Sequence, residues 1–186
     1  MNLFRKIFQR KPKQPHRDEW EAIIDQISSG FERVRTLWFI DCKLALTRFP
    51  DCKITNRDLI GNALTYAKTF QLYNGFLFVG KQQYISPSDG RDFADMLFKK
   101  ECAGVETYSA EYQMKLTSFK GTRNTEALMF VSDISVHLTG SKDAAWLMAM
   151  MPTLVKFVAE TNLIVANAFG DTKTSAKIKS HLVAMK

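Results

Sequence analysis

The residue pattern closest to a known chemical motif is GFLFVGKQ, at residues 75–82. It matches the phosphate-binding pattern GxxxxGK, in which backbone amides surround a phosphate and the lysine neutralises its charge. The match fails at Gln82, because Ser or Thr at that position would ligate Mg²⁺. Four bulky apolar residues separate the glycines, and a helix rather than a strand is expected before them. We therefore expect no nucleotide binding and interpret the run as a buried apolar turn.

A second candidate is the pair Asp133 and His137, which share one face if their segment is helical. Such a pair could ligate a metal, or act as a base and the group that orients it. A metal site needs three or four ligands, however, and no second pair of His or Cys accompanies this one. We interpret His137 as a histidine paired with a local carboxylate, and we expect no metal and no cofactor.

Carboxylates and thiols supply the remaining candidates for chemistry. Two groups of three acids lie within residues 89–111, one at intervals of three and one at intervals of five, which predicts a solvated helix face: Asp89, Asp92 and Asp95, and Glu101, Glu106 and Glu111. The three cysteines, Cys42, Cys52 and Cys102, form no CxxC pair, so we expect reduced, unpaired thiols. No GxSxG nucleophile motif occurs. These observations favour a protein without a catalytic site.

Charge is divided unevenly along the chain, whose formal net charge is +7. Of the 26 Lys and Arg, six lie in residues 1–17 and four in residues 172–186, whereas all 19 acids lie between these ends. The body of the chain is therefore slightly acidic. Nucleic-acid-binding domains usually spread cations over a groove or face. Basic ends on an acidic body instead indicate an arm or anchor, and we do not expect nucleic acid as a partner.

The strongest functional signal is the N-terminal segment, residues 1–11, MNLFRKIFQRK. In a helix its apolar residues fall within roughly 160° of arc, with cations opposite. Eleven residues are marginal as a helix in water, so the segment would fold on a surface. The predicted contact residues are Leu3, Phe4, Arg5, Lys6, Ile7, Phe8, Arg10 and Lys11.

This pattern suits an anionic membrane surface. An amphipathic helix docked in a partner protein's groove, packing on the chain's own domain, and disorder are alternatives that the hydrophobic pattern does not separate. Residues 12–17 contain two prolines and are expected to be a stiff linker. Residues 18–186 are expected to form a single globular domain.

Helical periodicity predicts the elements of that domain. Residues 18–49 carry an apolar stripe with Asp18 as the cap, and Asn74-Gly75 is expected to end the next helix. Further helices are predicted at 89–102, 105–119, 125–138, 152–169 and after Asp171. The fold expected is all-α with six to eight helices. An α+β fold with a small strand pair near 76–79 and 128–131 is the alternative.

Three function classes remain open at this stage. The first is a non-catalytic adaptor on a cytoplasmic membrane surface or partner protein, tethered by residues 1–11. The second is a small hydrolase or metal-dependent enzyme whose site forms only in three dimensions. The third is a nucleic-acid-associated protein that uses its basic ends. No apolar run of about 18 residues and no secretory leader is evident, which favours the cytoplasm.

Overall fold

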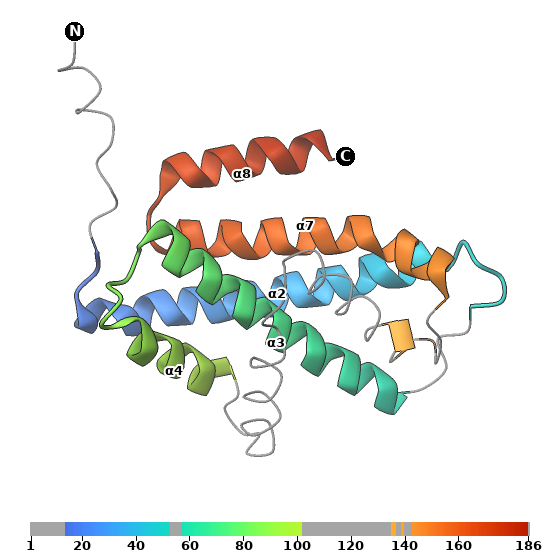
Figure 1. Cartoon of the computed structure of the whole chain (residues 1–186), viewed down its shortest axis with the longest axis horizontal. Helices are drawn as coiled ribbons and strands as arrows, with labels where there is room; N and C mark the ends of the chain where they lie inside the picture. Colours follow the sequence, from blue (N-terminus) through green and yellow to red (C-terminus); the bar gives the residue numbers. More distant parts are fainter. Residues whose placement is uncertain (1–13, 53–56, 102–134, 137–138, 140–142, 186) are drawn as a thin grey trace, which may run out of the picture.

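The computed structural model describes residues 14–52, 57–101, 135, 136, 139 and 143–185 (Figure 1). Their elements are a 3₁₀ turn η1 (Arg17–Glu19) and the helices α2 (Trp20–Leu46), α3 (Arg57–Gln82), α4 (Gly90–Glu101), α7 (Ala144–Ala168) and α8 (Thr172–Ala184). The all-α prediction is confirmed. The described residues hold five α-helices, fewer than the six to eight predicted. The predicted helices at 105–119 and 125–138 lie almost entirely outside the described residues, as does the strand position 128–131.

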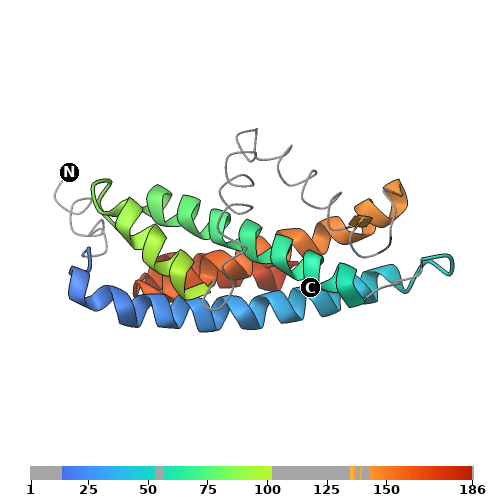
Figure 2. The same ribbon diagram turned by 90° about the horizontal axis from the view of Figure 1, so that it is seen from below.

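Two antiparallel helices, α2 and α7, form the long axis of the molecule, and α3 crosses them obliquely (Figures 1 and 2). Helix α4 packs on α2 and α3, while α8 turns back along α7. As a result, α2, α4 and α8 begin at the end of the bundle where α3 and α7 finish. We call this the loop end; it includes residues 14–19, 83–89 and 169–171.

The apolar stripe predicted along α2 is the main component of the core. Its members are all buried: Trp20, Ile24, Ile27, Phe31, Val34 and Trp38. The sequence also predicted that Ile23, Leu37, Ile40 and Leu44 widen this stripe. Ile23 is half-buried and packs on the core, whereas Leu37, Ile40 and Leu44 are 47%, 47% and 60% exposed. At 100° per residue these three lie roughly 100–160° from the centre of the stripe, so apolar character alone did not identify the core face.

Glycine allows the helices to approach closely at two positions. A Cβ on Gly30 would lie 2.7 Å from Ile164 of α7, and one on Gly75 would lie 2.9 Å from the Phe31 ring. Both distances are shorter than real Cβ contacts, so a side chain at either position would push the helices apart. Gly30 therefore allows α7 to pack closely on α2, and it does not interrupt α2.

Helix α3 continues through Asn74-Gly75, where the sequence predicted its end. The Asn74 side chain donates to the Phe70 carbonyl at 2.8 Å within the same helix, and Gly75 is needed for the contact with Phe31. Residues 76–79 are helical, so a strand there is excluded. Because these residues are helical, their side chains point in different directions. Val79 is buried in the core, whereas Leu77 is 41% exposed to solvent.

Helix α7 likewise runs unbroken past Pro152, where the sequence predicted the first turn of a new helix. A proline inside a helix removes one hydrogen bond to the carbonyl four residues earlier. That carbonyl belongs to Met148, which is 70% exposed, so water can satisfy it. The loss is therefore tolerated.

The predicted end of α7 and the predicted cap of α8 are confirmed, whereas the predicted starts of α2 and α7 are not. Asp143 accepts from the amides of Ala145 and Trp146, and Asp171 accepts from the Thr174 amide. Gly170 has a φ of +66°, the left-handed conformation that commonly ends a helix. Asp18 instead lies within η1, one residue before Glu19, which occupies the N-cap position of α2.

A buried polar cluster connects four helices, and we call it the Arg35–Glu101 cluster. The Arg35 guanidinium donates to Glu101 of α4 and to Gln71 of α3, both at 2.8 Å. Gln71 then donates to Thr161 of α7 at 3.2 Å. Its remaining members are Ser28, which donates to Glu101 at 2.5 Å, and Lys68, which donates to the Glu101 backbone carbonyl.

The burial of Glu101 corrects the prediction of a solvated acidic face at that residue, whereas Asp89, Asp92 and Asp95 are exposed as predicted. Glu101 is 6% exposed, Arg35 is 8% exposed, and Gln71 and Thr161 are fully buried. A buried charge is costly unless its partners satisfy it, and here the members of the cluster come from four helices. The cluster therefore fixes how α2, α3, α4 and α7 are placed along one another.

We expect Arg35→Met and Glu101→Leu to destabilise the fold by about 3–5 kcal/mol each, because each leaves a buried charge without its main partner. The double variant should cost less than the sum, with a coupling energy of about 0.5–3 kcal/mol. Urea unfolding of the four proteins measures these differences. Additive single effects would show that the two side chains do not act as a pair.

Candidate functional site

The eight predicted contact residues, Leu3, Phe4, Arg5, Lys6, Ile7, Phe8, Arg10 and Lys11, lie outside the described residues. The structure does show where this segment joins the folded part. Gln14 lies at the loop end, where its side-chain amide donates to the Gln83 carbonyl at 3.2 Å. The N-terminal segment therefore leaves the bundle beside the turn between α3 and α4.

The same turn holds the start of the C-terminal helix. Tyr84, next to Gln83, donates its hydroxyl to Asp171 at 2.9 Å, and Asp171 caps α8. Gln83 has a φ of +57°, so the chain turns sharply as it leaves α3. Residues 83 and 84 thus hold Gln14 and the start of α8 at one place.

Aromatic rings make this junction rigid. Tyr84 is 1% exposed and stacks on Phe169 at a centroid distance of 4.7 Å. Phe93 of α4 lies 5.7 Å from Phe169 and 5.6 Å from Trp20 of α2. Offset and edge-on rings at these distances attract one another beyond the effect of burial alone. The junction at Gln83 and Tyr84 is therefore firmly packed.

The hydrogen bond from Tyr84 also affects the ionisation of both partners. Burial, together with the negative Asp171, raises the pKa of Tyr84 well above its ordinary value. For Asp171, partial burial opposes ionisation, but hydrogen bonds from Thr174 and Tyr84 outweigh it and lower the pKa below 3.8. Asp171 thus caps α8 as a carboxylate at neutral pH.

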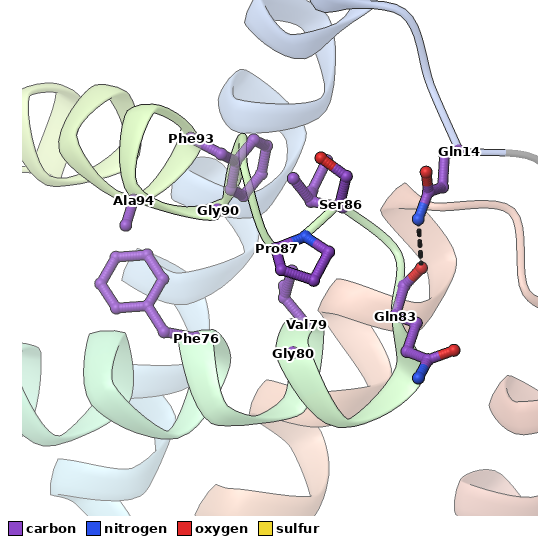
Figure 3. A pocket seen from close by; sticks show the side chains of 11 residues that line it. Gln14, Phe76, Val79, Gly80, Gln83, Ser86, Pro87, Gly90, Phe93 and Ala94 are labelled. Atoms are coloured by element: carbon purple, nitrogen blue, oxygen red, sulfur yellow. Dashed lines mark hydrogen bonds between the residues drawn. The ribbon is translucent and has the colours of Figure 1, made fainter.

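A groove of about 420 Å³ opens at the loop end, between α3, α4 and the turn that joins them (Figure 3). Its wall is largely apolar and its rim includes Gln14. Its apolar lining side chains include Phe76, Val79, Ile85, Pro87, Phe93 and Ala94. No ionisable side chain lines the groove, so it offers an apolar surface rather than a site for acid–base chemistry.

Helix α8 carries the second basic end on an exposed face. Lys173, Lys177 and Lys179 are exposed, and residues 172–186 contain no acid. Among the described helices α8 packs on α7, and Ser175 is its one buried residue. Ile178 and Leu182 are half-buried, whereas Val183 is 68% exposed, so the predicted apolar side is only partly covered.

In the described residues, the other candidate motifs are not arranged to bind a phosphate or a metal. Residues 75–82 lie within α3, where backbone amides are part of the helix and cannot surround a phosphate. Asp133 and His137 lie outside the described residues. Among those that are described, no group of three His, Cys, Asp or Glu side chains could hold a metal.

The two described cysteines are free, and both have a raised pKa. Cys42 is fully buried against Thr153, and burial raises its pKa to about 12. Cys52 is half-buried, and partial burial followed by the charge of Asp143 raises its pKa. A raised pKa lowers the thiolate fraction, so neither site resembles an activated nucleophile.

Helix α7 is long and apolar enough to cross a membrane, with a mean hydropathy of 1.3 over its 18-residue window. Length and composition alone do not separate such a span from a core helix. Here Phe157 packs on Trp38 at 4.8 Å, and Lys156 pairs with Asp41 of α2 at 2.6 Å. These contacts place α7 inside the helical bundle.

Tyr84→Phe should destabilise the protein by about 1–2 kcal/mol at pH 7, because it removes a buried hydrogen bond to a carboxylate. The lowered pKa of Asp171 stabilises the fold above pH 3.8, and this contribution is lost as pH falls below that value. The cost of Tyr84→Phe should therefore shrink in acid.

Chemical denaturation at pH 7 and below pH 3.8 measures this change. In an Asp171→Asn background the same substitution should cost much less at pH 7. An unchanged cost in that background would show that the phenol stabilises the loop end by packing alone.

Thiol labelling should distinguish the two described cysteines. In a Cys102→Ser variant at pH 8, Cys52 should react with Ellman's reagent well before Cys42, whose burial leaves it almost entirely protonated. After denaturation both thiols should react at once. Equal rates in the native protein would contradict the packing of Cys42 between α2 and α7.

The chain matches no known family model, no curated protein and no solved structure.

Proposed function

We propose that this protein is a non-catalytic adaptor held at a cytoplasmic, anionic membrane surface by residues 1–11. The observation that carries the proposal is the junction at Gln83 and Tyr84. It holds the N-terminal segment through Gln14 and the start of α8 through Asp171. The basic N-terminal segment therefore leaves the folded bundle at the end where the basic helix α8 begins, before α8 runs back along α7.

The sequence of the segment supports a lipid surface in particular. Partial burial of Leu3, Phe4, Ile7 and Phe8 in the headgroup region would contribute several kcal/mol at about 25 cal/mol per Å², before ordering costs. Each cation near anionic lipid adds about 1 kcal/mol, and this part weakens with salt. The exposed lysines of α8 would add to the same attraction over a longer range.

The remaining hypotheses have less support. An enzyme would need convergent polar groups, and the groove at the loop end is lined by apolar and uncharged residues. A nucleic-acid partner would need cations over a broad face, whereas they concentrate at the two ends. A protein groove that accepts the amphipathic segment is the main alternative, and vesicle binding separates it from a membrane.

Full-length protein should co-sediment with vesicles containing phosphatidylserine, bind them less at high salt, and bind neutral vesicles weakly. Phe4→Glu with Phe8→Glu should reduce binding at least tenfold, because it places two charges on the apolar arc. Lys173→Glu with Lys177→Glu should reduce it by a smaller, salt-dependent factor, since these lysines act by charge alone.

A matched control is Leu44→Glu with Met148→Glu, which changes two apolar residues that are 60% and 70% exposed elsewhere. It has the same change in net charge and should retain near-normal binding. Thermal unfolding should show that all variants remain folded. If wild-type protein binds no anionic vesicle, the membrane proposal is wrong, and residues 1–17 should then be used as bait for a protein partner.

A further inference from the structure

We propose that the groove at the loop end binds the chain's own Phe4 and Phe8, so that the N-terminal segment is sequestered until a membrane competes for it. The inference concerns regulation of the proposed membrane anchor and rests on that function. Docking in the groove can nevertheless be tested without any membrane.

The first argument is position. Gln14 lies on the rim of the groove and is fixed there by its hydrogen bond to Gln83 (Figure 3). Five residues separate it from Phe8, and an extended chain spans at most about 3.3–3.6 Å per residue. The tether is long enough to bring Phe8 into the groove and short enough to keep it nearby. A nearby tethered ligand has a high effective concentration, so even weak docking is populated.

The second argument is chemical fit. The groove presents Phe76, Val79, Pro87 and Ala94 without an ionisable side chain. A cavity of about 150 Å³ accommodates one benzene ring, so a volume of 420 Å³ has room for two aromatic side chains. Phe4 and Phe8 are four residues apart in the sequence and would lie on one face of a helix formed on docking. Their cationic neighbours would then face outward into water.

The open side of the groove is built from small residues. A Cβ added to Gly80 or Gly90 would meet no atom within 4 Å. Ala94, one turn after Gly90 on α4, also lines the groove, and Figure 3 shows it facing Phe76. Larger residues here would fill the space from within. Their absence leaves an apolar surface that a neighbouring apolar segment can cover.

Docking is tested directly by cysteine crosslinking in the full chain. Cys52 and Cys102 are replaced by Ser, while the buried, unreactive Cys42 is kept. Gln9→Cys with Gly80→Cys, which keeps both Phe4 and Phe8, should form an intramolecular disulfide readily under mild oxidation. Gln9→Cys with Ser29→Cys, which places the second thiol on an exposed position of α2, should form it at least tenfold more slowly. Equal rates would overturn the proposal.

Regulation is tested by filling the groove. Ala94→Trp should release the segment and strengthen binding to phosphatidylserine vesicles about three- to tenfold, the gain expected when a mostly sequestered state is removed. Ala22→Trp, on the exposed face of α2, is the matched control and should change nothing. Gly80→Leu, at an open position, provides a second groove variant if Ala94→Trp does not fold.

Opposite outcomes have distinct meanings. If groove variants weaken vesicle binding, the groove takes a lipid chain instead, and the proposal is wrong. If they leave binding unchanged, sequestration is wrong although the anchor stands. If crosslinking is selective but no variant binds vesicles, docking in the groove is supported, while the membrane function and its regulation both fail.

Discussion

The contact between Arg35 and Glu101 is the constraint on which the rest of the structure depends. Apolar stripes bring α2, α3, α4 and α7 together, but a stripe tolerates sliding and rotation of one helix on another. A buried guanidinium and a buried carboxylate do not, since each loses its hydrogen bonds if its helix shifts by one turn. Gln71 and Thr161 extend this constraint to α3 and α7. The cluster thereby sets the register that the loop end requires.

With the helices fixed in this way, the loop end becomes a rigid attachment point. The cluster holds the end of α4 through Glu101, while the Trp20–Phe93 contact holds the beginning. Between α3 and α4, Gln83 and Tyr84 can then bind Gln14 and Asp171 in fixed positions. An acidic bundle with a basic N-terminal segment attached at its loop end, beside the start of the basic helix α8, has a directional charge distribution. It would orient toward an anionic surface before any apolar residue made contact.

The sequence predicted those parts of the fold that depend on interactions between residues close together in the chain. The α2 stripe from Trp20 to Trp38, the end of α7 near Phe169 and the cap at Asp171 each depend on residues within a turn or two. Asn74-Gly75 was misread, because its role is set by Phe31, which is distant in sequence. Pro152 was misread for a similar reason, since its cost depends on whether the Met148 carbonyl reaches water.

The polar features were the least predictable. Glu101 lies in a run of acids that reads as solvated, and nothing near it in the sequence signals Arg35, which is 66 positions away. Arg35 itself, flanked by Val34 and followed by Trp38, was a weak hint that a charge lay on the buried side of α2. The groove at the loop end also had no local signal, because α3, α4 and Gln14 form it only together.

The central claim is that a folded bundle is held at an anionic surface by its N-terminal segment. Amide hydrogen exchange of the full chain, with and without phosphatidylserine vesicles, tests it most directly. The account predicts new protection at residues 1–11 and little change in α2 and α7. Protection that changes mainly within α7, with none gained at residues 1–11, would mean that the apolar core helix enters the membrane instead, and would contradict the account.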